Sequence, residues 1–259
     1  MIEIATRAAR KAGQVILEMY RGSHEIQVKG ERDIVTQADL AAEDLIIKEI
    51  LAGCPDAWII SEERYGHRTA HPERPSWYID PLDGTTNFAR GLPSFCVSIA
   101  MAQAGELVCG AVYDPLRDQL FYAQRGQGAY LNEDRLQVSD EENLTGAIVL
   151  LDWPREQDFR IKSGRALQNL LPLTSAVRST GCAALSLCYI AAGWADLYYQ
   201  YTLSPWDVAA GMLLIQEAGG KITGMDGRAP DLQQRDWLAT NGRLHSHVLE
   251  VAPFDLAES

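Results

Sequence analysis

The run WYIDPLDGTTNF at residues 77–88 constrains this chain more than any other segment, because it joins an apolar strand to two acids and a glycine turn. Pro81 has no backbone N–H and disfavours helix at the residue before it, so we expect the strand to end at Asp80. Asp80 and Asp83 then lie across a turn, where both carboxylates and the carbonyl of Leu82 can reach one point. Such an all-oxygen ligand set suits Mg²⁺, Mn²⁺ or Ca²⁺ rather than Zn²⁺.

The residues after these acids are suited to bind phosphate. Gly84 allows the backbone to approach a ligand closely, and a helix that begins at Thr85 would present free N–H groups and the positive end of its dipole. A strand followed by an ordinary Asp-Gly turn is the alternative for the short Asp-x-x-Asp-Gly pattern. The full run is more specific, and it predicts a metal site beside a phosphate site.

Acids elsewhere in the chain are candidates for the same site. Residues 58–61 form a second predicted strand, whose end presents Glu62. Glu63 should point to the opposite face, toward solvent or toward the loop at 64–75. Asp207 follows Ser-Pro-Trp at the predicted start of a helix, where an acid could serve only to complement the helix dipole. The residues alone leave Asp207 and Asp196 as alternatives for a distant ligand.

Three separated motifs resemble the inositol monophosphatase family of metal-dependent, lithium-sensitive-type phosphatases. They are DPLDGTTNF at 80–88, ISEE at 60–63 and PWDVAAG at 205–211, in the family's order, and the resemblance extends over about residues 29–220. It implies a layered α/β sandwich, with two mixed sheets between helix layers. It also implies a phosphoric monoester hydrolase and, as in many relatives, a homodimer.

The pattern of strands and helices divides the chain into two halves. A predicted antiparallel meander and a polar connector precede an alternation of strands with helices, which is typical of α/β architecture. We therefore expect an N-terminal α+β half, residues 1–142, with most metal ligands. The C-terminal α/β half, residues 143–259, would carry Asp207 and substrate contacts.

The resemblance implies two or three Mg²⁺ ions per site. Carried over residue by residue, it assigns Glu62, Asp80 and the carbonyl of Leu82 to the first ion. Asp80 would bridge to the second ion, which Asp83 and Asp207 complete. Clamping a phosphate between metal ions stabilises the charge that develops during phosphate ester hydrolysis.

The resemblance also assigns catalytic and substrate-binding roles. Glu62 and Thr85 would orient and deprotonate the attacking water, with Asp39 behind the threonine, although from the residues alone Asp39 could simply cap a helix with Thr36. The implied substrate-binding residues are Asp83, Gly84, Thr85, Thr86, Ala183, Gln200 and Asp207.

Gln200 departs from the family pattern, because inositol-preferring relatives commonly have a glutamate at this position. A glutamine accepts a hydrogen bond through one oxygen but also donates, and it carries no charge. The predicted function is Mg²⁺-dependent hydrolysis of small phosphate monoesters by metal-activated water attack, with myo-inositol monophosphate as first candidate. The alternatives are fructose 1,6-bisphosphate, NADP or a nucleotide bisphosphate as substrate, and a regulatory or binding protein on the same fold.

The composition limits partners and location. A formal net charge of −12 over 259 residues argues against a nucleic-acid surface, and it requires a cation between protein and phosphate. Five cysteines without a C-x-x-C pair predict buried thiols in a reducing cytoplasm. No apolar stretch is long enough to predict a membrane span.

Overall fold

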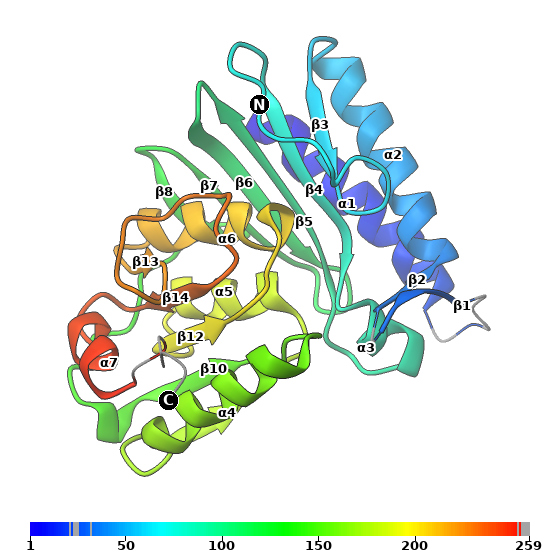
Figure 1. Cartoon of the computed structure of the whole chain (residues 1–259). Coiled ribbons are helices and arrows are strands. Elements are labelled where there is room, and N and C mark those ends of the chain that lie inside the picture. The colour runs from blue at the N-terminus through cyan, green and yellow to red at the C-terminus, as the bar shows by residue number, and fades with distance from the viewer. Residues whose placement is uncertain (21, 23–25, 32, 253, 255–259) are drawn as a thin grey trace.

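The computed structural model describes residues 1–20, 22, 26–31, 33–252 and 254, and its elements form five layers, helix–sheet–helix–sheet–helix (Figure 1). The predicted layered α/β sandwich with two mixed sheets is confirmed. The predicted boundary at residues 142 and 143 falls in the connector between the two sheets, and the division into halves stays a prediction. Residues 255–259 of the predicted second half lie outside the described residues.

The first layer is a pair of helices, α1 (Ile2–Met19) and α2 (Gln37–Gly53). The buried face of α1 consists mainly of alanines, which let the helix approach its neighbours closely. At the start of α2, Thr36 and Asp39 form a capping box, so the cap that the sequence offered for Asp39 is present. Next to it lies a two-stranded hairpin of β1 (Ile26–Gly30) and β2 (Asp33–Thr36).

The second layer is a seven-stranded sheet in which the strands follow chain order. The first pair is parallel and every later pair is antiparallel. Its strands are β3 (Trp58–Ser61), β4 (Ser76–Asp83), β5 (Cys96–Gln103), β6 (Glu106–Asp114), β7 (Gln119–Gln124), β8 (Gly128–Leu131) and β9 (Asp134–Arg135).

Strand β4 corrects one expectation, because it continues beyond Asp80 to Asp83. Its pairing with β5 shifts register between these two residues, so Pro81 lies in a bulge, where a missing N–H costs no ladder hydrogen bond. The bulge keeps both acids on the strand. Gly84 then adopts a positive φ of 91° and precedes the short helix α3 (Thr85–Arg90).

The middle layer consists of α5 (Ala183–Ala191) and α6 (Pro205–Glu217), which lie between the sheets. The five-stranded sheet has the order β11-β10-β12-β14-β13. Helices α4 (Gln157–Leu170) and α7 (His245–Val251) cover its outer face. The remaining elements are the 3₁₀ helix η1 (Leu144–Gly146), β10 (Ile148–Leu151), β11 (Ala176–Arg178), β12 (Leu197–Gln200), β13 (Lys221–Thr223) and β14 (Trp237–Thr240).

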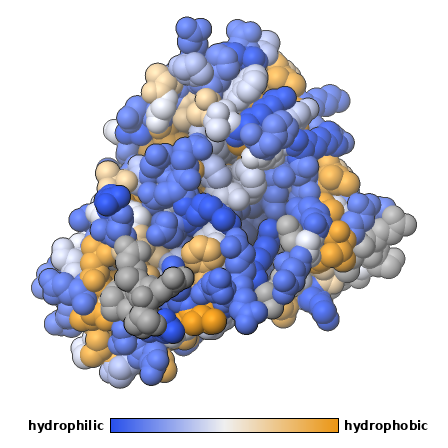
Figure 2. All heavy atoms as spheres, viewed as in Figure 1, coloured by the Kyte–Doolittle hydropathy of each residue, from blue (hydrophilic) through white to orange (hydrophobic). Residues whose placement is uncertain are grey.

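The apolar side chains gather in three buried clusters between these layers. Figure 2 shows that one face of the molecule is mainly hydrophilic, with small scattered hydrophobic groups. Among the described helices, none combines the length and apolar character that a membrane crossing requires. The five cysteines are all buried and free.

Candidate metal and phosphate site

Acidic side chains from distant parts of the chain meet at one cavity of about 360 Å³. Glu62 follows β3, two further acids belong to β4, and Asp207 is in the first turn of α6. Because α6 packs across the seven-stranded sheet, its N-terminus lies beside the carboxyl ends of the parallel pair β3 and β4. The predicted site residues that line the cavity are Glu62, Asp80, Leu82, Asp83, Gly84, Thr85, Thr86, Ala183, Gln200 and Asp207.

These carboxylates raise one another's pKa values. Burial, followed by the charges of Glu62, Asp83 and Asp207, holds the pKa of Asp80 well above its ordinary 3.8. Burial also raises the pKa of Asp83 to about 6 and that of Asp207 to about 8. Acids that repel one another in a partly water-excluded site need cations to be charged together, so this donor set fits hard divalent ions bound through oxygen.

Lys29 supplies one positive charge at the edge of this cluster. Its ammonium nitrogen lies 3.3 Å from Glu62 Oε1 and 2.8 Å from Glu63 Oε1. Of the two surroundings expected for Glu63, solvent is wrong, because its side chain is only 4% exposed. Burial raises the pKa of Glu63 to about 7, against the lowering effect of Lys29.

Thr85 lies against Asp39, which the cavity itself does not include. The threonine hydroxyl is 3.0 Å from Asp39 Oδ1 and 2.9 Å from the carbonyl oxygen of Leu82. Asp39 is fully buried, and its Oδ2 accepts hydrogen bonds from the backbone and side chain of Thr36. Asp39 therefore caps α2 with one oxygen and orients Thr85 with the other.

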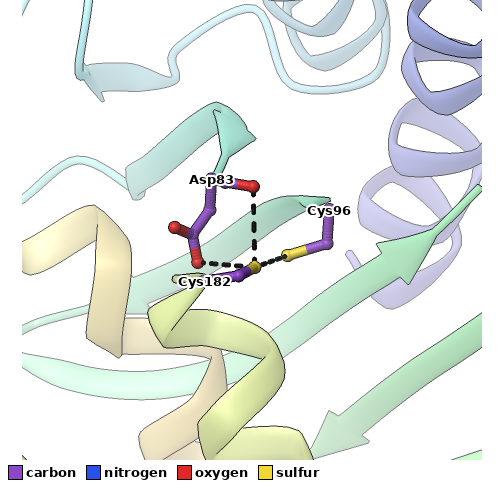
Figure 3. Close-up of side chains that lie close together, drawn as sticks. All are labelled: Asp83, Cys96 and Cys182. Atoms are coloured by element: carbon purple, nitrogen blue, oxygen red, sulfur yellow. Dashed lines mark hydrogen bonds between the residues drawn. The ribbon is translucent and has the colours of Figure 1, made fainter. Parts of the chain in front are cut away.

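Two thiols lie close to Asp83, and one of them contacts it directly (Figure 3). The Sγ atom of Cys182 lies 3.2 Å from Asp83 Oδ2 and 3.5 Å from the Sγ atom of Cys96. The N–H of Ala184, in the first turn of α5, donates to the same carboxylate oxygen at 2.6 Å. Burial raises the pKa of both thiols, so both are neutral. Cys182 is therefore a weak donor to the carboxylate that adds no charge, and Cys96 packs against its sulfur.

Asp207 and Asp196, which the residues alone left as alternatives, have different surroundings. Asp207 lines the cavity, and its Oδ2 accepts the N–H of Ser204 in a capping box. Asp196 instead accepts from the N–H of Ile148 and the hydroxyl of Ser139, outside the cavity lining. Asp196 is therefore a structural acid, whereas Asp207 is open to a ligand.

The loop before α5 forms another wall of the cavity. Asp152 Oδ1 accepts the N–H of Gly181 at 2.6 Å and the hydroxyl of Ser179 at 2.9 Å. From the other side, the amide of Asn87 in α3 donates to the carbonyls of Thr180 and Gly181. This loop therefore connects α3, at one end of the cavity, with Asp152, which follows β10.

Comparison with known proteins identifies the fold and these motifs together. A model of the inositol monophosphatase family matches residues 1–255. The chain belongs to this family. It is similar to "Inositol-1-monophosphatase" of Mesorhizobium japonicum, at 38% identity over 258 residues, which are 97% of this chain and 95% of that protein. It is also similar to "Nus factor SuhB" of Pasteurella multocida, at 41% identity over 252 residues, which are 96% of this chain and 94% of that protein.

Solved structures support the same assignment. The suhB protein of Bartonella henselae superimposes with a TM-score of 0.91 at 32% identity, covering 99% of this chain and 98% of that one. The IMPase of Thermotoga maritima gives 0.89 at 31% identity, covering 97% and 96%. Members of the inositol monophosphatase family are generally metal-dependent, which agrees with the acidic cavity.

The cavity also contains residues that the sequence did not single out. Asp152 and Tyr198 line it, and Lys29 borders its acidic end. Tyr198 lies within the apolar run of a strand, as many core tyrosines do, so its residue type alone did not indicate that it lines the cavity. The alternation along β12 could have found it, because Tyr198 lies on the same strand face as Gln200.

Proposed function

We propose that this protein is a Mg²⁺-dependent phosphatase that hydrolyses small phosphate monoesters. The observation that carries the proposal is the position of Asp80, which is buried among Glu62, Asp83 and Asp207. Burial, and then the charges of these three acids, raise its pKa. A buried cluster of acids with this arrangement is stable in its charged form only around cations. Membership in the inositol monophosphatase family supports a phosphate ester as the substrate class.

The ions would be held by oxygen atoms alone. Glu62, Asp80 and the carbonyl of Leu82 would hold one Mg²⁺. Asp80, Asp83 and Asp207 would hold a second, and the site would bind two or three ions in all. When bound, the ions would neutralise the phosphate and make the attacking water more acidic.

The chain's own groups would complete the reaction. Thr85 is held in one orientation by Asp39, so its hydroxyl can position the water, while Glu62 can accept the proton. Gly84 and Thr86, with Thr85, would hold the phosphate oxygens from the turn at the start of α3. A side chain at Gly84 would collide with the carbonyl oxygen of Ser94 at 2.8 Å, so the tight turn requires glycine.

The first candidate substrate is myo-inositol monophosphate, with its ring against Ala183 and Gln200. Fructose 1,6-bisphosphate, NADP and nucleotide bisphosphates are the alternatives with the same chemistry. Comparing kcat/KM across these four substrate classes decides between them. We also propose that the protein works as a cytoplasmic homodimer. Size-exclusion chromatography with light scattering tests its oligomeric state.

The phosphatase is tested by phosphate release from myo-inositol 1-phosphate, with and without Mg²⁺. We expect activity only with Mg²⁺, and a loss of at least about a hundredfold in Asp80→Asn. The exposed acid Asp44, changed to Asn, is the matched control and should retain activity. Turnover without any metal, or turnover unaffected by Asp80→Asn, would contradict the mechanism.

A second candidate function is a binding or regulatory role. Several similar proteins carry the name "Nus factor SuhB", which describes a factor rather than a phosphatase. The test is affinity capture of partners by the wild type and by a variant that lacks Asp80, Asp83 and Asp207. A partner that both bind equally, together with absent phosphatase activity, would favour the binding role.

A further inference from the structure

Two polar groups at the wall of the cavity have no hydrogen-bond partner among the described residues. They are the hydroxyl of Tyr198 and Oε1 of Gln200, both on β12 and both lining the cavity. Tyr198 is 0% exposed and Gln200 is 6% exposed. By contrast, Tyr199 points to the opposite face of the strand, where its hydroxyl donates to the carbonyl of Ser163 at 3.0 Å.

An unpaired buried hydroxyl is unfavourable, since it gives up its bonds to water and gains nothing in return. Among the acids, Asp152 has the largest electrostatic effect on the phenol. Its Oδ1 already accepts hydrogen bonds from Gly181 and Ser179. Burial keeps the pKa of Tyr198 well above its ordinary 10.0, so the phenol is a neutral donor. A polar pair of this kind is satisfied when a ligand with hydroxyl groups enters the cavity.

We propose that Tyr198 is a specificity residue that, together with Gln200, binds hydroxyl groups on the alcohol part of the substrate. The inference rests on the proposed phosphatase function. The tyrosine donates, the glutamine oxygen accepts, and a substrate hydroxyl can do both. A bound phosphate ester of a polyol can therefore pair both protein groups, whereas an ester of an alkyl alcohol leaves both unpaired.

The test compares two phosphate esters that share a six-membered ring and differ in its hydroxyl groups. They are myo-inositol 1-phosphate and cyclohexyl phosphate, and kcat/KM is measured for both with the Mg²⁺-loaded enzyme. For Tyr198→Phe we expect kcat/KM to fall roughly tenfold to a hundredfold on the inositol ester and to change less than about threefold on the cyclohexyl ester. The melting temperature should stay the same or rise, because the variant removes an unpaired buried group.

The matched control is Tyr199→Phe, which removes the same atom from the other face of the same strand. It breaks a hydrogen bond inside the protein, so it should lower the melting temperature and leave the ratio of the two kcat/KM values unchanged. Equal losses on both esters in Tyr198→Phe, or no loss on either, would overturn the inference. Absence of Mg²⁺-dependent turnover of both esters by the wild type would instead overturn the phosphatase function itself.

Discussion

Asp80 stabilises the proposed metal-bound state but destabilises the metal-free fold. Its pKa is raised above the unfolded value of 3.8, so the folded state binds its proton more tightly than the unfolded chain does. Stability from this group is therefore full at low pH, and it is lost as the pH rises above about 4 toward the raised pKa of the folded state. Near pH 8 the metal-free protein must either keep the proton or carry a repelled charge.

We predict that Asp80→Asn raises the melting temperature of the metal-free protein at pH 8 by roughly 3–6 °C, from about 1–2 kcal/mol, and by almost nothing at pH 4. An asparagine oxygen can still accept the N–H of Leu82, which Asp80 Oδ1 accepts at 3.0 Å. The same variant should lose the stabilisation that Mg²⁺ gives the wild type. Differential scanning fluorimetry at both pH values measures this, and a lower melting temperature at pH 8 would contradict it.

We expect the reaction to need the hydroxyl group of Thr85 rather than the shape of its side chain. Thr85→Val keeps the branched side chain but removes the contact with Asp39. We expect kcat to fall roughly a hundredfold to a thousandfold, with a small change in KM, because positioning of the water is lost while phosphate binding remains. Thr85→Ser restores the hydroxyl and should recover most of the loss. Equal activity of the valine and serine variants would exclude the role.

At the scale of elements, α7 is joined to the five-stranded sheet through a buried histidine. His245 is 1% exposed, and its Nε2 and Nδ1 each lie 3.0 Å from a threonine hydroxyl, on Thr223 and Thr240 respectively. The Thr223 hydroxyl donates to the carbonyl of Gly224, so it accepts from Nε2–H, and Thr240 donates to Nδ1. This arrangement requires the neutral ring.

The joint between α7 and the sheet should therefore be sensitive to acid. Burial, with the charge of Lys221, lowers the pKa of His245 from 6.5 to about 4. The unfolded chain takes up the proton first, so stability is full above pH 6.5 and is lost as the pH falls toward 4. This group should cost about 2–3 kcal/mol between pH 7.5 and pH 4.5.

We predict that His245→Gln is less stable than the wild type at pH 7.5 but loses less stability on acidification, by about that amount. Urea unfolding at the two pH values measures both quantities. The exposed loop residue His67, changed to Gln, is the control and should follow the wild type. A wild type and a His245→Gln variant with the same acid-induced loss would refute the prediction.

The local sequence pattern predicted which strands and helices form better than it predicted the residues at which they end. Strand β4 shows why, since Pro81 is a local reason to stop, whereas the bulge that accommodates it depends on pairing with β5. Glu63 shows the same limit, because the alternation of a strand assigned it to solvent or to the following loop, whereas its ion-pair partner is Lys29 from a distant hairpin. Both differences arise from contacts between segments that are far apart in the sequence.

At the scale of the whole molecule, the site depends on how α6 lies across the seven-stranded sheet. The sequence could identify acids at strand ends, but the choice of Asp207 over Asp196 needed either a family resemblance or the packing itself. The hydroxyl of Ser98 in β5 donates to the carbonyl of Trp206 at 3.2 Å. This hydrogen bond connects the start of α6 to the seven-stranded sheet. We therefore expect this helix–sheet contact to set the distance between Asp207 and the acids of β4.

At Gly110, β6 and α6 approach each other closely. A Cβ atom there would lie 2.9 Å from Ala210 Cα and 3.2 Å from its Cβ, and backbone on both sides cannot move aside as a flexible side chain would. Ala210 is three residues after Asp207 in α6. Any displacement of the helix from β6 therefore displaces Asp207 relative to Asp80.

We predict that Gly110→Ala destabilises the protein by about 1–3 kcal/mol and lowers kcat/KM roughly tenfold or more, although it touches no residue of the cavity. Gly164→Ala is the matched control, because Gly164 lies inside α4 with no atom within 4 Å of an added Cβ. It should stabilise the protein by about 0.5–1 kcal/mol and leave kcat/KM unchanged. Thermal unfolding and kinetics on one substrate at saturating Mg²⁺ measure both effects. If Gly110→Ala proved unstable yet fully active, the spacing of the acids would be independent of the β6–α6 contact, and the loops beside the cavity would have to set it.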